Sequence, residues 1–332
     1  MSPEFVIVGQ GLAGTALAWA LLRRGRRVRV IDRGRSDSAS RVAAGLITPV
    51  TGKRLARSWW WDELYPSAVA FYRAIEAETG APFFHRRPAL RLFATEEERD
   101  EYNRRESGVL RGLVRAADVG AGFAAPFGGF EMSDAARLDV PRYLDTSREY
   151  FRARGVFVAG DVSPHDPPPA EVVVFCRGFT TDSDPYFGRV RFNAAKGEML
   201  TVRVPGLCET RVVHRGVWLA PLGDDRFRVG ATYTWEPLDS RPTVAGRAEI
   251  EAKLRAFLKL PFEVLDHRAA VRPVIDAGFP ALGRHPTHPR LAYFNGLGSK
   301  GSLLSPFFAN QLAAHLCGAG AIDERVDVRK LL

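Results

Sequence analysis

Glycines close to the N-terminus have the spacing of a phosphate-binding turn. The segment 9–14 has the sequence Gly-Gln-Gly-Leu-Ala-Gly. Gly9 permits a tight turn, Gly11 lets the backbone approach a pyrophosphate, and Gly14 lets a helix pack closely on a strand. The phosphates would lie on the N-terminal amides of a helix that starts at Leu12, where the helix dipole favours negative charge. The pattern predicts dinucleotide binding.

Asp32 follows at the end of a second predicted strand, where its carboxylate is placed to accept hydrogen bonds from a ribose. Arg33 and Arg35 come just after it, and such arginines would also suit a 2′-phosphate. The motif alone therefore does not separate FAD from NAD or NADP.

Further segments resemble those of a known family, in the same order along the chain. They are Ala44 to Pro49, Ala195 to Glu198, Val229 to Thr232, Val271 to Asp276, Pro280 to Gly283 and Gly296 to Gly301. With the glycine motif they span nearly the whole length. The chain resembles the D-amino-acid oxidase family of FAD-dependent oxidoreductases, which includes glycine oxidase, sarcosine oxidase and the oxidase domain of a bifunctional tRNA-modifying enzyme. The segment Gly-Leu-Gly-Ser-Lys-Gly is closer to the last of these.

This resemblance implies an α/β fold in which a Rossmann-type FAD-binding domain carries an inserted antiparallel β-sheet substrate domain, with the flavin ring between them. We expect residues 1–80, 135–188 and 265–332 in the FAD-binding domain, and residues 81–134 and 189–264 in the substrate domain. No cysteine or histidine lies where the family attaches flavin covalently, so the expected FAD is non-covalent. The residues expected to bind it are Gly9, Gly11, Leu12, Ala13, Gly14, Asp32, Arg33, Ala44, Gly45, Leu46, Gly178, Gly296, Gly298, Ser299, Lys300 and Gly301.

Three residues are candidates for catalysis. Arg272 aligns with the family's substrate-carboxylate arginine, and its guanidinium suits a bidentate carboxylate; the alternative is a structural ion pair with Asp276 or with an acid of the FAD-binding domain. Tyr233 would point toward the flavin and close the pocket, or else belong to the core. Lys300, in the C-terminal glycine loop at a helix start, would stabilise the negative charge of a reduced flavin, or else be solvated.

Weaker candidates lie after the Ala44–Gly45 loop. Lys53 and Arg54 would lie near the flavin or a substrate acid group, or else in a solvated turn. Trp59, Trp60 and Trp61 would in part line a pocket and in part be packing. The histidines are scattered, and we assign no role to His85, His214 or His267.

The elements that must position these residues begin with a βαβ unit: a strand at Phe5–Val8, a helix from Leu12 to Arg24 and a strand at 28–32. The run Val172–Phe175 indicates another buried parallel strand, leading to Gly178. Short alternating strands from Val190 to Tyr233 predict an antiparallel sheet. Helices are expected at 66–79, 243–259 and 302–316, and an ordered loop at 40–61.

Composition narrows the class of protein. A chain of 332 residues with 46% hydrophobic residues excludes a disordered or fibrous protein. The net charge of +9 comes almost wholly from arginine, which reflects either genome composition or an anionic partner such as FAD, an acidic substrate or RNA. Three distant cysteines predict a reducing compartment without disulfide or zinc. We interpret the uncharged stretch from Phe5 to Leu22 as strand, turn and helix rather than a signal peptide, which predicts a cytoplasmic protein without membrane attachment.

The expected reaction is hydride transfer from a substrate Cα–H to flavin N5, giving an imine that hydrolyses, with O2 or another acceptor reoxidising the flavin. The substrate would be a small amine or amino acid. One alternative is a tRNA-modifying oxidase acting on a carboxymethylaminomethyl-uridine. Another is a flavin-binding protein without catalysis. The oligomeric state is left open.

Overall fold

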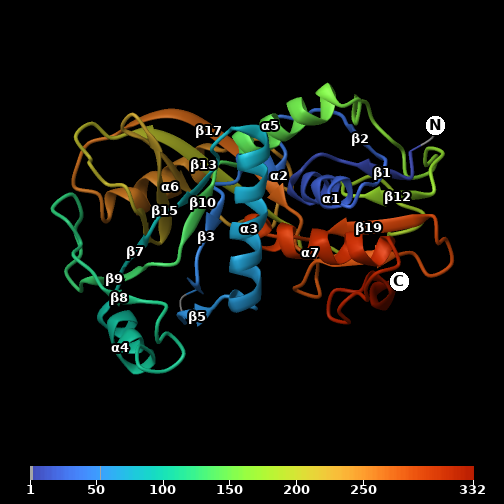
Figure 1. The fold of residues 1–332 in the computed structure, drawn as a ribbon. Coiled ribbons are helices and arrows are strands. Elements are labelled where there is room, and N and C mark those ends of the chain that lie inside the picture. Colours follow the sequence, from blue (N-terminus) through green and yellow to red (C-terminus); the bar gives the residue numbers. More distant parts are fainter. Residues whose placement is uncertain (1–2, 53) are drawn as a thin grey trace.

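Two large sheets organise the molecule (Figure 1), a computed structural model that describes residues 3–52 and 54–332. The first sheet, within these residues, has the spatial order β11 (Phe157–Ala159), β2 (Val28–Asp32), β1 (Phe5–Val8), β12 (Val172–Phe175), β19 (Leu291–Asn295) and β18 (Ala281–Arg284). Its strands are parallel except for β18, which runs antiparallel to β19.

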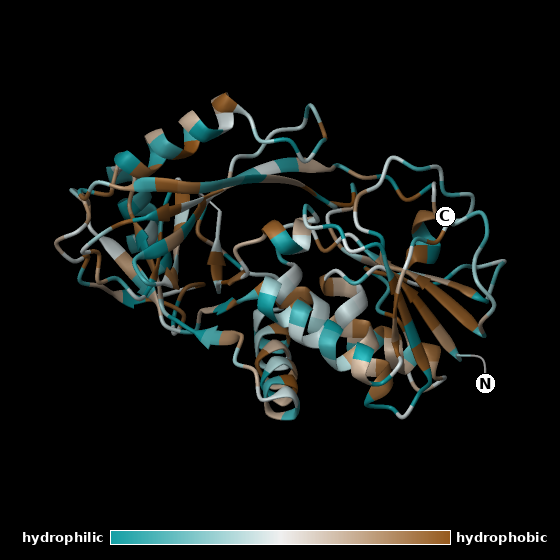
Figure 2. Ribbon diagram, turned by 90° about the horizontal axis from the view of Figure 1, so that it is seen from above, coloured by the Kyte–Doolittle hydropathy of each residue, from teal (hydrophilic) through white to brown (hydrophobic). Residues whose placement is uncertain are grey.

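The central strands of this sheet are buried on both faces. β1 and β12 are continuous apolar runs, buried along their whole length and in parallel register. Such runs are typical of parallel strands that helices cover on both sides. Helices α1 (Leu12–Leu22) and α7 (Gly301–Leu316) pack together against this layer, and Figure 2 shows its strands as a hydrophobic fan near the N-terminus.

The second sheet has the spatial order β17 (Glu263–Arg272), β13 (Ala195–Arg203), β16 (Arg226–Gly230), β15 (Val217–Gly223), β14 (Val212–Arg215), β7 (Ala89–Leu92), β9 (Gly129–Met132) and β8 (Arg115–Ala116). Neighbouring strands of this sheet are antiparallel, except for β14 and β7, which pair in parallel. Helix α6 (Val244–Arg255) covers one face, where Ile250 and Leu254 are buried against apolar side chains of the sheet.

Shorter elements connect the two sheets. Helix α3 (Trp61–Thr79) stands between them (Figure 1) and packs against α7. The remaining elements are the strands β3 (Leu46–Ile47), β10 (Ala136–Leu138), β6 (Phe84–Arg86), β4 (Val50–Thr51) and β5 (Ala56–Arg57), the helices α2 (Ala39–Val42), α4 (Glu96–Arg105) and α5 (Val140–Ala153), and a 3₁₀ helix at Val328–Leu331. None of the helices in the described residues is long and apolar enough to cross a membrane.

The predicted elements are largely confirmed. The βαβ unit forms as expected, and so does the antiparallel sheet, although the parallel pairing of β14 with β7 was not foreseen. The segment 40–61 was expected to be a loop, but it contains α2, β3, β4 and β5. Helix α3 begins at Trp61 and not at Pro66, because burial of Trp61 and Leu64 outweighs the tendency of proline to start a helix.

The proposed division into two domains stays a prediction. β6, from the predicted substrate domain, pairs with β10, from the predicted FAD-binding domain. The two ranges are therefore joined by backbone hydrogen bonds as well as by the chain itself.

Candidate functional site

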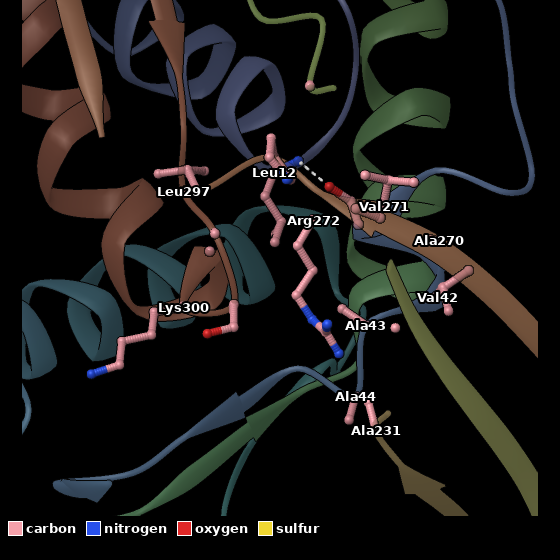
Figure 3. Close-up of a pocket in the computed structure, with 18 of the residues that line it drawn as sticks. Leu12, Val42, Ala43, Ala44, Ala231, Ala270, Val271, Arg272, Leu297 and Lys300 are labelled. Atoms are coloured by element: carbon pink, nitrogen blue, oxygen red, sulfur yellow. Dashed lines mark hydrogen bonds between the residues drawn. The ribbon is translucent and has the colours of Figure 1, made fainter. Parts of the chain in front are cut away.

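A pocket of about 1230 Å³ lies between the two large sheets. Its walls come from the turn between β1 and α1, the segment 37–48, strands β13 and β17, and the segment 297–303. Figure 3 shows how β17 and the start of α7 meet there. Nearly all residues expected to bind FAD line this pocket; the exceptions are Gly14 and Gly296.

The glycines of the N-terminal turn have different roles. A Cβ on Gly9 would lie 2.4 Å from the carbonyl oxygen of Cys176, and one on Gly14 would lie 1.9 Å from that of Gly9. These two glycines are required by the packing of the protein itself. A Cβ on Gly11 would meet only the hydroxyl of Ser40, at 3.0 Å, so this position has space toward the pocket.

The N-terminus of α1 is suited to a phosphate group. No side chain caps the helix at Gly11, and its first turn holds no acidic residue. The Leu12 amide donates to Oγ of Ser40 at 3.1 Å, and the amides of Ala13 and Gly14 have no acceptor among the described residues. Unpartnered amides at the positive end of a helix dipole are what a pyrophosphate requires. The residues present therefore fit the phosphates of a dinucleotide.

Asp32 ends β2 beside this turn. Its carboxylate accepts the amide of Gln10 at 2.8 Å and that of Gly34 at 2.7 Å, and Arg148 lies 3.3 Å away. A carboxylate has about four acceptor sites, so capacity remains for a ribose hydroxyl.

The two arginines after Asp32 already have acidic partners. Arg33 pairs with Asp161 at 3.4 Å, and Arg35 pairs with Asp37 at 2.6 Å. Hydrogen bonds from Arg35 hold the pKa of Asp37 well below its usual range. Asp37 also accepts a hydrogen bond of 2.6 Å from Ser240, which belongs to the loop after β16. This contact joins the two sides of the pocket mouth.

The C-terminal glycine loop brings α7 to the same pocket. Gly296 and Gly298 have φ angles of 81° and 56°, and a Cβ on Gly301 would lie 2.8 Å from the Leu12 side chain. The close approach at Gly301 places the start of α7 against the start of α1. Lys300 occupies the N-cap position without a side-chain cap, and Ser299 beside it also lines the pocket.

Two further predicted glycines shape the walls. Gly45 has φ 76°, and a Cβ there would lie 1.9 Å from the carbonyl oxygen of Leu138, so it permits the contact of this loop with β10. Ala44 and Leu46 on either side of it line the pocket. Gly178 accepts a hydrogen bond of 2.8 Å from the Asn295 side chain, which ties it to the end of β19.

Arg272 extends from β17 toward Ala44 and Ala231 (Figure 3) and has no acidic partner among the described residues. It donates to the carbonyl oxygen of Thr232 at 3.1 Å and to that of Lys196 at 3.4 Å. Burial lowers the pKa of its guanidinium. The ion pair with Asp276, which was the structural alternative, is not formed. A half-buried cation whose hydrogen bonds go only to carbonyl groups is a ready site for an anion.

Of the other two catalytic candidates, Tyr233 lies beside Arg272 and Lys300 points away from it. The Tyr233 ring lies 5.1 Å from the Arg272 guanidinium and is half exposed, so Tyr233 is not a core residue. Lys300 is half-buried, and its side-chain amine has no hydrogen-bond or ion-pair partner in the described part of the chain; burial lowers the pKa of this amine. In the view of Figure 3 it points away from Arg272.

The weaker candidates do not gather at the pocket. Arg54 is exposed and does not line it, and Lys53 lies outside the described residues. The tryptophan side chains pack against other aromatic rings: Trp59 stacks on Trp60 with 4.4 Å between ring centroids, and Trp61 stacks on Tyr65.

Several pocket residues were missed from the sequence, among them Arg91, Met199, His214 and Trp218. All lie on strands of the second sheet. The alternation along β14 and β15 separates the two faces of each strand, but only the pairing of strands far apart in sequence shows that these side chains share one wall.

The chain is similar to curated enzymes over almost its whole length. It is 29% identical to a putative thiamine biosynthesis oxidoreductase of Rhizobium etli, covering 97% of this chain and 99% of that protein. It is 24% identical to glycine oxidase of Bacillus licheniformis, covering 98% and 96%. The similarity to the tRNA 5-methylaminomethyl-2-thiouridine biosynthesis bifunctional protein of Marinobacter nauticus, at 25% identity, covers 94% of this chain but 55% of that protein.

Solved structures share the fold. Glycine oxidase of Geobacillus kaustophilus superposes with a TM-score of 0.80 at 21% identity, covering 96% of this chain and 95% of that one. Iminodiacetate oxidase of Chelativorans gives 0.76 at 22% identity, covering 97% and 98%. The family model described as FAD dependent oxidoreductase matches residues 4–315. The chain therefore belongs to this family of FAD-dependent oxidoreductases.

Proposed function

We propose that the protein oxidises the C–N bond of an amino acid or secondary amine, with Arg272 binding the substrate carboxylate. The observation that carries this proposal is the environment of Arg272, a half-buried guanidinium at the pocket wall that donates to two carbonyl oxygens and has no acidic partner among the described residues. A guanidinium has five N–H donors, so several stay free for a ligand. A carboxylate there would form a charge-assisted, bidentate pair.

FAD, when bound, supplies a two-electron acceptor at flavin N5 for the hydrogen on the substrate Cα. The chain would hold it through the turn at 9–14, Asp32, the segment 44–46, Gly178 and the loop 296–301. Arg272 would orient the substrate so that its Cα–H faces the ring, and such positioning lowers the barrier without a protein base when the amine is already deprotonated. The oxidised substrate is an imine, which water converts to a carbonyl compound and an amine.

The comparisons support the same substrate class. Proteins named glycine oxidase and iminodiacetate oxidase share this fold, and both names denote oxidation of amino acids with carboxylate groups. Tyr233, half exposed above Arg272, would cover the bound carboxylate from the solvent side.

The test is anaerobic titration of the purified, FAD-loaded protein with glycine, sarcosine and D-amino acids, following loss of the flavin absorbance band. Arg272→Ala should reduce the rate of bleaching by amino acids at low concentration by about 100-fold, because a charge-assisted pair contributes up to about 3 kcal/mol. Arg284→Ala is the matched control. Arg284 also donates to two backbone carbonyls, those of Pro289 and Leu316, but it lies away from the pocket. Equal kinetics for Arg272→Ala and the wild type would exclude this binding mode.

A second candidate is oxidation of a modified uridine in tRNA. It is favoured by the similarity to the bifunctional tRNA-modifying protein and by the net charge of +9. A flavin band that is bleached by tRNA carrying a carboxymethylaminomethyl group, and by none of the free amines, would select this candidate. If neither the tRNA nor the free amines reduce the flavin, the result would indicate a flavin-binding protein without catalysis.

A further inference from the structure

One short segment contacts both Arg272 and the loop beside the glycine turn. Residues 231–240 follow β16 and lead toward the start of α6. The members of this segment that line the pocket are Ala231, Thr232, Tyr233, Leu238, Asp239 and Ser240. The segment therefore runs along the pocket from the side of Arg272 to the side of the glycine turn.

The first half of the segment holds Arg272. The carbonyl oxygen of Thr232 accepts a hydrogen bond from Arg272 at 3.1 Å, and the Tyr233 ring lies 5.1 Å from the guanidinium. Lys196, whose carbonyl oxygen also accepts from Arg272, pairs with Thr234 through two backbone hydrogen bonds of 2.8 and 3.1 Å. A shift of this half of the segment would therefore move groups that fix the Arg272 guanidinium.

The second half of the segment reaches the loop after β2. The Ser240 hydroxyl donates to the Asp37 carboxylate at 2.6 Å. Asp37 lies between β2 and α2, three residues before Ser40, and the Ser40 hydroxyl accepts the Leu12 amide at the glycine turn. A hydroxyl that donates to a carboxylate forms a short, charge-assisted hydrogen bond. Ser240 thus ties the segment to the part of the chain that would hold the pyrophosphate of FAD.

The segment is held at its ends and weakly between them. Nζ of Lys196 lies 2.6 Å from the Asp239 carboxylate, and the Lys196 side chain is 2% exposed, so this ion pair fastens the end of the segment to β13. Among the described residues, 235–238 make no hydrogen bond, and Trp235 is 59% exposed. A stretch with few buried contacts opens locally at low cost. The closed arrangement therefore depends on the contacts at the two ends.

Ligands at the two ends would stabilise the same closed arrangement. A carboxylate at Arg272 would fix the guanidinium and, through it, the carbonyl group of Thr232. FAD in the pocket would face Ser240 and Asp37, which the closed segment joins at the lining. When two ligands favour one conformation, each raises the affinity of the protein for the other by the same factor.

We propose that the segment 231–240 couples the two ligands, so that a substrate carboxylate at Arg272 and FAD strengthen each other's binding. Ser240 is the positioning residue for this coupling. The inference rests on the proposed function for the carboxylate at Arg272. It goes beyond it by assigning a role in substrate binding to Ser240, whose hydrogen bond goes to Asp37 and not to Arg272.

The test measures the release of FAD from the loaded protein, so it does not depend on turnover. The protein is diluted with and without saturating (methylsulfanyl)acetate, a carboxylate that has no amine to oxidise, and the rise in flavin fluorescence gives the release rate. Binding of the compound is followed separately by the change in the flavin spectrum. We expect the compound to slow the release of FAD about tenfold in the wild type, which is within the usual range for coupled sites.

The variants assign the coupling to Ser240. In Ser240→Ala the release without the compound should become faster, and the slowing by the compound should fall below about threefold, the remainder coming from direct contact between compound and flavin. Ser240→Thr, which keeps the hydroxyl group, should retain most of the slowing. Ser107→Ala, at an exposed position outside the pocket lining, is the matched control and should behave as the wild type. A serine that only stabilised the fold would change the two release rates by the same factor.

Two results would overturn the coupling: a release rate that the compound does not change in the wild type, or the same slowing in Ser240→Ala as in the wild type. If either is found while the compound binds to the wild type and not to Arg272→Ala, the carboxylate site stands and the coupling fails. If the compound binds equally to the wild type and to Arg272→Ala, the proposed binding mode at Arg272 fails, and the coupling that rests on it fails with it.

Discussion

The guanidinium of Arg272 occupies the space that a side chain at position 197 would fill. A Cβ built on Gly197 would lie 2.0 Å from Nη2 of Arg272 and 2.4 Å from its Cζ. Gly197 lies on β13, in the strand pair that holds Arg272 at the end of β17. The absence of a side chain on one strand thus fixes where a cation from its neighbour can lie.

Gly197→Ala should therefore act like a mutation of Arg272. The added methyl group displaces the guanidinium, and we expect the KM for amino acids to rise at least about tenfold with little change in FAD content. Steady-state kinetics with sarcosine and the flavin-to-protein absorbance ratio measure the two effects. Gly108→Ala, at an exposed position where a Cβ meets only one atom at 3.7 Å, is the control. An unchanged KM in Gly197→Ala would show that Arg272 is not held in this position.

The glycine turn separates cofactor binding from folding. Gly11→Ala should leave the protein folded, because the new methyl group meets only the flexible Ser40 side chain, yet it should lose most of its FAD, since the methyl group projects toward the pyrophosphate site. Gly14→Ala should destabilise the apoprotein itself by about 3 kcal/mol, because its Cβ would overlap the carbonyl of Gly9. Thermal unfolding of the apoproteins and FAD titration distinguish the two. Equal melting temperatures for both variants would contradict the assignment.

Lys300 should influence the reduction potential of bound FAD. It lines the pocket, and no acid neutralises it in the described residues, so its positive charge would favour the negatively charged, reduced flavin. We expect Lys300→Met to lower the two-electron potential by about 30 mV, which corresponds to about 1.4 kcal/mol. Spectroelectrochemical titration measures this directly. Lys259→Met, at an exposed position outside the pocket lining, should leave the potential unchanged.

His214 should make the protein less stable in acid. The pKa of His214 is about 3 in the folded state, below the value of about 6.5 expected in the unfolded chain. Between these values the unfolded state binds more protons, so the stability is present at neutral pH and is lost as the pH falls through this window. The loss from pH 7 to pH 5 is about 2 kcal/mol.

Denaturant unfolding at pH 7 and pH 5 tests this contribution. His214→Phe should reduce the difference in unfolding free energy between the two pH values by about that amount. His165→Phe, at an exposed position, should leave the difference as in the wild type. Parallel losses in the wild type and in His214→Phe would place the acid sensitivity elsewhere.

The part of the site that comes from one short stretch of the chain could be predicted from the sequence. The turn at 9–14 and Asp32 follow from spacing within one βαβ unit, and the structure brings them to one pocket as expected. Arg272 was identified only through the resemblance to a family, since its surroundings depend on β13. Composition and periodicity do not predict which strands that are distant in sequence pair with each other.

The wall of the pocket that the second sheet forms illustrates this limit. His214 was given no role, because its position depends on β14 pairing in parallel with β7, more than a hundred residues earlier. Parallel pairing of this kind is set by the packing of the whole sheet and leaves no local signal. The early start of α3 has a similar cause, since Trp61 and Leu64 gain from burial against parts of the chain that a sequence window does not include.

The order of segments in the parallel sheet has a consequence for biosynthesis. β1 and β2 leave the ribosome before β12, which follows after more than a hundred further residues, and β19 with the loop 296–301 comes more than a hundred residues after β12. The part of the site that would face the phosphates can form before the part that would face the ring, which needs residue 301. A nascent chain that stalls before residue 301 would therefore display a phosphate-binding turn without the loop that would hold the ring.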